Sequence, residues 1–202
     1  MKKYSYLALG DSYTIGEQVP LFENFPYQAV QLLRKKYGHL FYAPEIVAKT
    51  GWTTDELTTS IDNTVFLPKY DNVSLLIGVN NQYRGRSVEN YKEEFSLLLK
   101  KAIAFAGGNH QKVFVLSIPD WGITPFAKER DAEKIAKEID DYNNACRQIA
   151  EQEKCIFIDI TASQRADGSS PIYLATDELH PSGNEYAKWA EKLADNIAAS
   201  IT

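Results

Sequence analysis

The chain has 202 residues, a length that suits one domain of generous size or two small ones. Its composition, with 44% hydrophobic and 24% charged residues, is typical of a soluble globular protein. A net charge of −5 argues against nucleic acid as a partner, because a phosphate backbone binds basic surfaces. No apolar stretch reaches the roughly 18 residues that a membrane-spanning helix requires, so we expect no membrane span.

The N-terminus and the cysteines bear on where the protein resides. The charged stretch Met1–Lys3 precedes an apolar run, as in a signal peptide, but the run that begins at Tyr4 is interrupted at Asp11. No cleavage site of small residues follows, so we interpret the run as a strand. We expect a cytoplasmic protein, or a secreted one if a leader has been removed. Cys146 and Cys155 fit buried, reduced thiols.

Short apolar runs recur along the whole chain and predict five strands. Because they are apolar almost throughout, they suit strands buried on both faces of a parallel sheet. The second strand adjoins Pro44, which a central strand tolerates poorly, so we expect this strand at an edge. The five runs are Tyr4–Leu9, Ile46–Ala48, Val73–Ile77, Val113–Ile118 and Cys155–Ile160.

The stretches between these runs have helical periodicity. They predict a first helix over Phe25–Tyr37 and a short second one at Thr53–Glu56, where the residues have the spacing of a capping box. Longer helices are predicted over Ser87–Ala106 and Asp131–Lys154, and a last one from about Ser182.

The alternation of strand and helix, without linker or repeat, predicts one α/β domain over residues 1–202. We expect a five-stranded, doubly wound parallel sheet with helices on both faces. The flavodoxin-like strand order 2-1-3-4-5 would put the Pro44 strand at an edge, as required. In such sheets ligands bind beyond the carboxyl ends of the strands, so the residues that follow each run are the ones to examine.

A serine follows the first strand. In the segment Gly10–Gly16, Ser12 lies on a tight turn after the strand, where its hydroxyl can reach a substrate carbonyl. Its backbone N–H faces the same space and can stabilise a developing oxyanion. The alternative is an ordinary polar turn, because Gly, Asp and Ser are common turn residues.

Two more polar groups follow the second and third strands. Gly51 allows close approach of a ligand to the backbone, and its N–H is free to donate. Asn80 can direct its amide toward an oxyanion. Taken singly, each has a simpler interpretation: Gly51 as a turn glycine, and Asn80 as a residue that caps its loop.

A histidine follows the fifth strand, three residues after an aspartate. Because positions i and i+3 share a face of a helical turn, Asp177 can reach the ring of His180. The carboxylate would fix the ring tautomer and stabilise the imidazolium, as in a serine hydrolase triad. The other two histidines, His39 and His110, precede strands and therefore lie at the opposite end of the sheet. His180 is the one candidate base.

Together these segments resemble the four conserved blocks of the SGNH (GDSL-type) hydrolase family, from Tyr4 to Trp189. The resemblance implies Ser12 as nucleophile and an oxyanion hole made of the Ser12 N–H, the Gly51 N–H and the Asn80 side chain. The matching motifs are Gly10-Asp11-Ser12-x-Thr14-x-Gly16, Gly51, Gly78-x-Asn80 and Asp177-x-x-His180-Pro181. Two positions depart from the usual pattern: Asn81 replaces an aspartate and Tyr13 a leucine.

We therefore expect a serine esterase or lipase-type hydrolase that requires neither cofactor nor metal. The partner is a small-molecule ester, with preference for short acyl groups such as acetyl, including acetylated sugars, because no insertion is long enough to form a hydrophobic lid. The expected pocket walls are Trp52, Tyr83, Arg84, Trp121 and Tyr173. Arg84 or Arg86 could reach the pocket rim and favour anionic substrates, although a solvated loop before Ser87 is the better interpretation of Arg86.

Other functions remain open at this stage. A lysophospholipase or a thioesterase could use the same site. A flavodoxin-like nucleotide-binding module has little support, because no GxGxxG or GxxxxGK[ST] loop follows the first strand. A catalytically silent binding protein on this scaffold would have no need of Ser12, Asp177 and His180 together. The oligomeric state cannot be inferred from the sequence.

Overall fold

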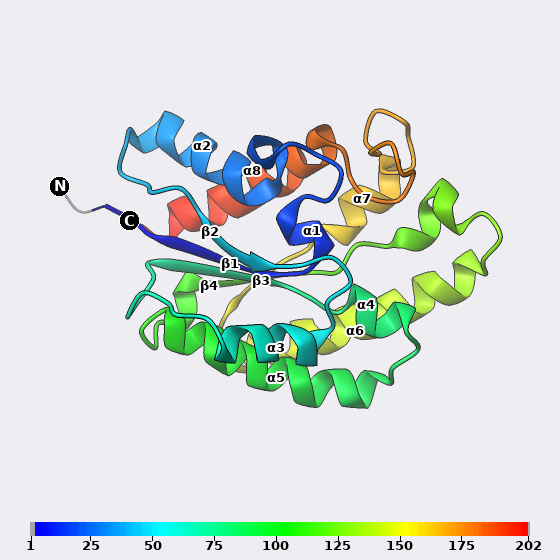
Figure 1. The fold of residues 1–202 in the computed structure, drawn as a ribbon, viewed down its shortest axis with the longest axis horizontal. Coiled ribbons are helices and arrows are strands. Elements are labelled where there is room, and N and C mark those ends of the chain that lie inside the picture. Colours follow the sequence, from blue (N-terminus) through cyan, green and yellow to red (C-terminus); the bar gives the residue numbers. More distant parts are fainter. Residues whose placement is uncertain (1–2, 202) are drawn as a thin grey trace.

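A five-stranded sheet lies between two layers of helices in the computed structural model, which describes residues 3–201 (Figure 1). Met1 and Lys2, part of the stretch compared above with a signal peptide, lie outside the described residues. The sheet and both layers form the single α/β domain that the sequence predicts.

All neighbouring strands pair in parallel, in the order β2-β1-β3-β4-β5. This order confirms the predicted topology and puts the strand beside Pro44 at an edge. The three central strands are buried along their whole length, including the polar Asn72 and Ser74 of the third strand in the chain. The bounds are β1 Tyr6–Gly10, β2 Glu45–Ala48, β3 Asn72–Leu76, β4 Val113–Leu116 and β5 Ile156–Ile158.

Helices cover both faces of the sheet (Figure 1). On one face α2, Phe25–Tyr37, packs against α8, Gly183–Ala199. The other face carries α3, Thr54–Asp62, α5, Val88–Phe105, and α6, Ala132–Gln152. Short helices complete the fold: α1 Ser12–Ile15, α4 Val79–Tyr83 and α7 Thr161–Asp167, with 3₁₀ turns η1 Leu21–Glu23, η2 His110–Lys112, η3 Trp121–Ile123 and η4 Pro125–Ala127.

Side-chain caps explain where the predicted helices begin. The Ser87 hydroxyl accepts a hydrogen bond from the Asn90 N–H at the start of α5. At the start of α3, the Thr53 N–H donates to the Glu56 carboxylate over 2.9 Å, as the capping-box spacing predicts. The caps satisfy N–H groups that have no acceptor within the helix.

The predicted strands four and five extend beyond the observed ones because the chain leaves the ladder at a serine. The Ser117 hydroxyl, just after β4, accepts hydrogen bonds from the N–H groups of Ile160 and Thr161 over 2.9 and 3.1 Å. A side chain thus replaces the backbone pairing that would have continued both strands. The first predicted strand also starts early, since Tyr4 forms only an isolated bridge with Phe41.

A cluster of aromatic rings lies beneath the carboxyl end of β1. Tyr13 on α1 lies 6.3 Å from Trp189 on α8, between ring centroids, and Trp189 in turn lies 6.2 Å from Phe25 on α2. All three side chains are almost wholly buried. The cluster joins the short α1 to the two long helices of one face and so fixes the residues that begin α1.

Candidate active site

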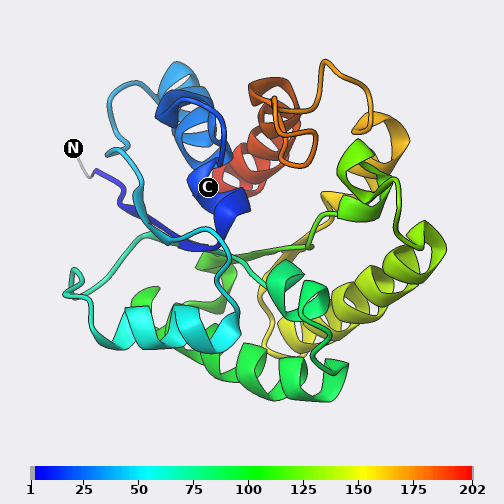
Figure 2. The same cartoon turned by 45° about the vertical axis from the view of Figure 1, so that its right-hand side comes forward.

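The carboxyl end of the sheet brings together segments that are far apart in the sequence. Figure 2 turns this end toward the viewer, with α1, α4 and the loop before α8 around it. Ser12, Asn80 and His180, one from each of these segments, line a single cleft. The predicted site residues of these three segments therefore do meet.

Ser12 opens α1 directly after β1. Asp11 caps this short helix by accepting the Tyr13 N–H over 3.0 Å, and Gly16 ends it with φ 76°, a conformation that glycine adopts readily. At the first position of a helix, the Ser12 N–H has no acceptor within the helix. The hydroxyl and the N–H of one residue are thus both available at the end of the sheet.

Ser12, His180 and Asp177 form a hydrogen-bonded chain. The Ser12 Oγ lies 3.0 Å from His180 Nε2, and His180 Nδ1 lies 2.6 Å from Asp177 Oδ2. Because the carboxylate can only accept at Nδ1, that nitrogen carries the ring proton and Nε2 is left to accept from the Ser12 hydroxyl. The arrangement is the one that activates a serine as nucleophile.

Asp177 is held as a carboxylate. Its other oxygen, Oδ1, accepts the N–H groups of Leu179 and His180 over 3.1 and 3.0 Å. Partial burial on its own would raise the pKa of Asp177, but the hydrogen bonds from His180 and Leu179 outweigh burial and lower it. The group that orients His180 therefore stays ionised near neutral pH.

The loop that carries these two residues is itself braced. The His180 carbonyl accepts the Ala175 N–H over 2.8 Å, and Leu174 forms an antiparallel bridge with Pro181. The ring of Tyr13 lies 5.2 Å from the ring of His180, between centroids. His180 is consequently held from its backbone, from Asp177 and from α1.

Gly51 and Asn80 form the opposite side of the cleft. Gly51 has φ 83° in a turn closed by the Trp52 N–H, which donates to the Lys49 carbonyl over 3.2 Å. A positive φ at the third position of a turn favours glycine. Within residues 3–201 the Gly51 N–H has no protein acceptor. Asn80 Nδ2 donates one hydrogen to the Trp52 carbonyl over 3.0 Å, which leaves its second N–H available.

The cleft between these groups has a volume of about 210 Å³ and mostly apolar walls. Of the predicted walls, Tyr83 and Trp121 line it, with their rings 5.2 Å apart between centroids. Five further residues line the cleft although the sequence did not indicate them as walls: Tyr13, Thr50, Val79, Phe126 and Leu179.

Four of these five residues lie within or beside one of the sequence motifs. Val79 occupies the free position of Gly78-x-Asn80, and Leu179 a free position between Asp177 and His180. Thr50 and Tyr13 each adjoin a residue already singled out. Their places in the sequence put these four residues at the same end of the sheet as the motifs, where they line the cleft. Phe126, on η4, has no such signal, because only the three-dimensional fold brings η4 to the cleft.

Three predicted walls do not line the cleft: Arg84, which is described below, and the two aromatic residues Trp52 and Tyr173. The Trp52 side chain is partly buried against the hydrophobic core. The ring of Tyr173 lies beneath the ammonium group of Lys188, with Nζ 3.4 Å from the ring centroid. Both residues are in loops at the correct end of the sheet, but these contacts turn their rings to other partners.

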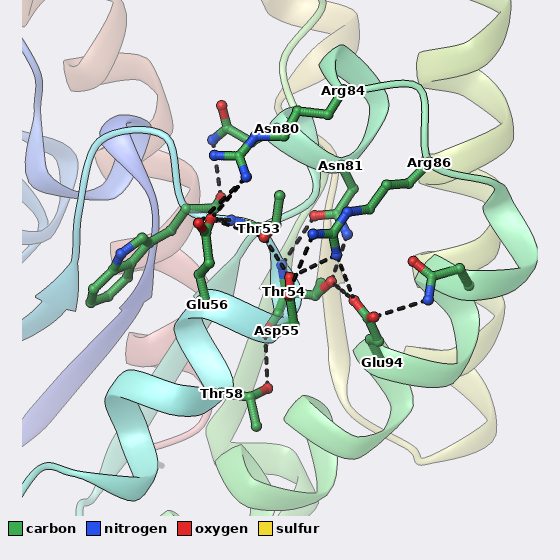
Figure 3. A network of polar contacts seen from close by, with 12 residues as sticks. Thr53, Thr54, Asp55, Glu56, Thr58, Asn80, Asn81, Arg84, Arg86 and Glu94 are labelled. Atoms are coloured by element: carbon green, nitrogen blue, oxygen red, sulfur yellow. Dashed lines mark hydrogen bonds and ion pairs between the residues drawn. The ribbon is translucent and has the colours of Figure 1, made fainter.

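The two arginines after α4 both pair with carboxylates at the start of α3 (Figure 3). Arg84 also donates to the Gly51 carbonyl over 2.6 Å and is therefore at the cleft rim. Arg86 Nη1 lies 2.7 Å from Asp55 Oδ1 and does not line the cleft. This contact agrees with the interpretation of Arg86 as part of a loop away from substrate.

No metal site is formed within the described chain: no three His, Cys, Asp or Glu side chains of residues 3–201 lie together in a way that could hold an ion. Cys146 and Cys155 are free and buried, and burial raises the pKa of each thiol to about 12. Over the same residues, no helix combines the length and the apolar character needed to cross a membrane.

Comparison with known proteins finds similar sequences. The sequence model of the GDSL-like lipase/acylhydrolase family matches residues 8–188. An acetylxylan esterase from Geobacillus stearothermophilus is 25% identical over an alignment of 162 residues, and the match covers 76% of this chain and 71% of that protein.

Solved structures share the fold. The crystal structure of an acetylxylan esterase from Geobacillus stearothermophilus has a TM-score of 0.75 at 21% identity, and the match covers 97% of this chain and 94% of that one. A lipase/acylhydrolase from Enterococcus faecalis has a TM-score of 0.72 at 19% identity, over 99% and 97% of the two chains. The family resemblance and the α/β architecture expected from the sequence are both confirmed.

Proposed function

Because the chain belongs to the GDSL-like lipase/acylhydrolase family and is an ester-hydrolysing enzyme, we propose that it cleaves carboxylic esters through an acyl-enzyme on Ser12. The observation that carries this proposal is the chain of two hydrogen bonds, Ser12 Oγ to His180 Nε2 at 3.0 Å and His180 Nδ1 to Asp177 Oδ2 at 2.6 Å.

Acylation follows from these contacts. His180 Nε2 takes the proton as Ser12 Oγ attacks the ester carbonyl, and Asp177 stabilises the imidazolium that forms. Negative charge develops on the carbonyl oxygen, which the N–H groups of Ser12 and Gly51 and the Asn80 amide stabilise. His180 then protonates the departing alkoxide, and the alcohol leaves.

Deacylation repeats the steps with water. His180, neutral again, takes a proton from a water molecule that attacks the acyl carbonyl. The same three donors stabilise the second oxyanion, and the acid is released as Ser12 regains its proton. Ser12, Gly51 and Asn80 therefore act twice in each turnover.

The size of the cleft supports small acyl groups as substrates. Its volume of about 210 Å³ is below the roughly 300–1,000 Å³ of pockets that hold drug-sized ligands. A cavity of about 150 Å³ accommodates a benzene molecule. An acetyl group, or an acyl group up to about the size of one ring, therefore fits, whereas a fatty chain would extend into solvent.

Acetylated sugars are the alcohol component that we favour. The relative from Geobacillus stearothermophilus is an acetylxylan esterase, and the cleft rim here carries the half-exposed ring of Tyr83 beside Trp121. Aromatic faces of this kind pack against sugar rings while leaving hydroxyl groups in water. We further propose a reducing compartment such as the cytoplasm, supported by two free thiols.

Substitution of the nucleophile tests the proposal. Ser12→Ala should lower kcat on p-nitrophenyl acetate by about 10⁴-fold or more, because no other group can form the acyl-enzyme. Circular dichroism should be unchanged, since the alanine fits a position already helical. If the variant folds normally and retains turnover near that of the wild type, Ser12 is not the nucleophile.

A further inference from the structure

Arg84 links the cleft to the start of α3. Its Nη2 donates to the Gly51 carbonyl over 2.6 Å, and its Nη1 lies 3.3 Å from Glu56 Oε2 (Figure 3). Glu56 is in turn fixed by the capping box, in which it accepts the Thr53 N–H. A guanidinium at the end of α4 thus connects the Gly51 turn to a helix terminus that cannot easily move.

The Gly51 turn has few other constraints on its geometry. Glycine is the residue with the greatest backbone freedom, and φ 83° is one of several conformations open to it. The Trp52 N–H closes the turn by donating to the Lys49 carbonyl, and the Asn80 side chain donates to the Trp52 carbonyl. The Thr50 hydroxyl donates to Glu17, and Arg84 supplies the contact on the carbonyl of Gly51 itself.

We propose that Arg84, held by Glu56, is a positioning residue: by fixing the Gly51 carbonyl it restricts rotation about the two backbone dihedral angles of Gly51, and so keeps the Gly51 N–H, which belongs to the preceding peptide group, directed at the oxyanion. The inference rests on the proposed function, because it requires Gly51 to be an oxyanion donor. An oxyanion hole accelerates a reaction only when its donors are fixed before charge develops. Arg84 provides that fixation without touching the substrate.

The contacts of Arg84 argue against the other role considered for it, direct binding of an anionic substrate. Its guanidinium already pairs with Glu56 and donates to the Gly51 carbonyl, so part of its charge and of its donor set is taken. A substrate carboxylate would have to compete with both partners. The pair is about half exposed, and exposed ion pairs contribute little to stability.

Arg86 offers a matched control on the same loop. Like Arg84, it pairs with a carboxylate in the first turn of α3, here Asp55, over 2.7 Å. It is less exposed than Arg84 and also lies 3.5 Å from Glu94, but it makes no contact with Gly51. Arg86→Met therefore removes a comparable ion pair without loosening the cleft.

Steady-state kinetics on two esters distinguishes positioning of Gly51 by Arg84 from direct binding of an anionic substrate. We would measure kcat and KM for p-nitrophenyl acetate and for the anionic mono-p-nitrophenyl succinate. Arg84→Met should lower kcat on both esters by about 10-fold, less than the roughly 10²–10³ lost with an oxyanion donor, and change KM by less than about twofold. Arg84→Lys, which keeps one donor for the Gly51 carbonyl, should recover part of the loss.

An alkylboronic acid gives a second readout, because it forms a tetrahedral adduct whose oxygen occupies the oxyanion position. Its inhibition constant should rise for Arg84→Met by the same factor as kcat falls. Glu56→Gln, which can still accept the Thr53 N–H, should show a smaller loss of about two- to fivefold. Arg86→Met should stay within about twofold of the wild type in both measurements.

Two outcomes would overturn the inference. One is equal kinetics for Arg84→Met and Arg86→Met, with similar melting temperatures. The other is an effect confined to KM for the succinate ester, which would make Arg84 a substrate-binding group. Ser12→Ala is measured in parallel: undiminished turnover by that variant would refute the acyl-enzyme itself, whereas its inactivity together with unaffected Arg84→Met refutes only the positioning role.

Discussion

Asp11, the residue before the nucleophile, is a carboxyl group with no exposed surface. One oxygen caps α1, and the other, Oδ2, has no hydrogen-bond partner among the described residues. Burial raises the pKa of Asp11 to about 7, although the N–H groups of Tyr13 and of Asp11 itself partly oppose the rise. The turn that presents Ser12 therefore holds a carboxyl group whose ionisation is unfavourable.

The pH dependence of stability follows from this pKa. Between pH 4 and about pH 7 the unfolded chain loses the Asp11 proton and the folded chain retains it. The free energy of unfolding therefore falls as the pH rises through this window and levels off above it. A rise of the pKa from 3.8 to about 7 corresponds to roughly 4 kcal/mol as an upper bound.

Asp11→Asn should consequently stabilise the protein at pH 8 and do so far less at pH 4. The amide oxygen can still accept the Tyr13 N–H, while the buried charge is gone. Thermal unfolding of both proteins across pH 4–8 provides the measurement. A melting-temperature difference that is constant over this range would show that Asp11 does not titrate as its burial implies.

The junction between α3 and α4 explains why Asn81 stands where the family usually has an aspartate. Because the Thr54 N–H can only donate, it fixes Oδ1 of Asn81 as its acceptor, at 3.1 Å. The Asn81 Nδ2 then donates to the Thr54 hydroxyl over 2.6 Å, and that hydroxyl donates to Glu94. With Glu94 taking the hydroxyl proton, only an amide at position 81 can complete the chain.

Asn81→Asp should therefore destabilise the protein by about 2–4 kcal/mol at pH 7, since a buried carboxylate would face a hydroxyl with no hydrogen to give. Glu94→Gln should restore much of the loss in the double variant, because the glutamine amide can donate to Thr54 and free its proton for the aspartate. Urea unfolding of the two single variants and the double variant measures this coupling. Additive losses would contradict the account.

The long elements could be predicted because their signals are local. The helix over Phe25–Tyr37 and the edge position of the strand beside Pro44 follow from periodicity and from proline chemistry. The short helices α4 and α7 could not be predicted, because one or two turns carry no amphipathic period. Their formation depends on contacts such as that of Asn81 with Thr54, 27 residues away in sequence.

The candidate site likewise has residues that the sequence predicts and contacts that it does not. Ser12, Gly51, Asn80, Asp177 and His180 follow from the motifs and from the rule that parallel strands present their carboxyl ends to one edge. The hydrogen bond from Arg84 to the Gly51 carbonyl could not be predicted from the sequence, because the two residues meet only when α4 packs beside the start of α3. Trp52 and Tyr173 are predicted as pocket walls because of their residue type, but residue type does not determine the direction in which a ring points.

At the scale of the whole molecule, the elements of the sheet and its helices account for most of residues 3–201, and no segment of this part of the chain forms a lid over the cleft. The cleft, with a volume of about 210 Å³, is lined by residues of α1, α4 and η3 among other elements. An acyl chain beyond the cleft gains little of the roughly 0.8 kcal/mol available for each buried methylene. Under the proposed function, we therefore expect the architecture to set the upper size of a well-bound acyl group.

Acyl-chain length gives a direct check of this limit. The ratio kcat/KM should be high for p-nitrophenyl acetate and butyrate, lower for the octanoate and lowest for the palmitate. Assays below the micelle concentration of each ester avoid an apparent fall caused by aggregation. A steady climb with chain length would reveal an acyl channel that is absent from this structure.

The central claim, an acyl-enzyme on Ser12, is tested most directly by mass spectrometry after reaction with a fluorophosphonate, which phosphonylates activated serines. We expect the wild-type protein to gain the mass of one phosphonyl group, mapped by peptide sequencing to Ser12, and His180→Ala to react far more slowly because the proton acceptor is lost. Ser12→Ala should gain none. A wild-type adduct mapped to another residue, or stoichiometric labelling of Ser12→Ala, would contradict the account.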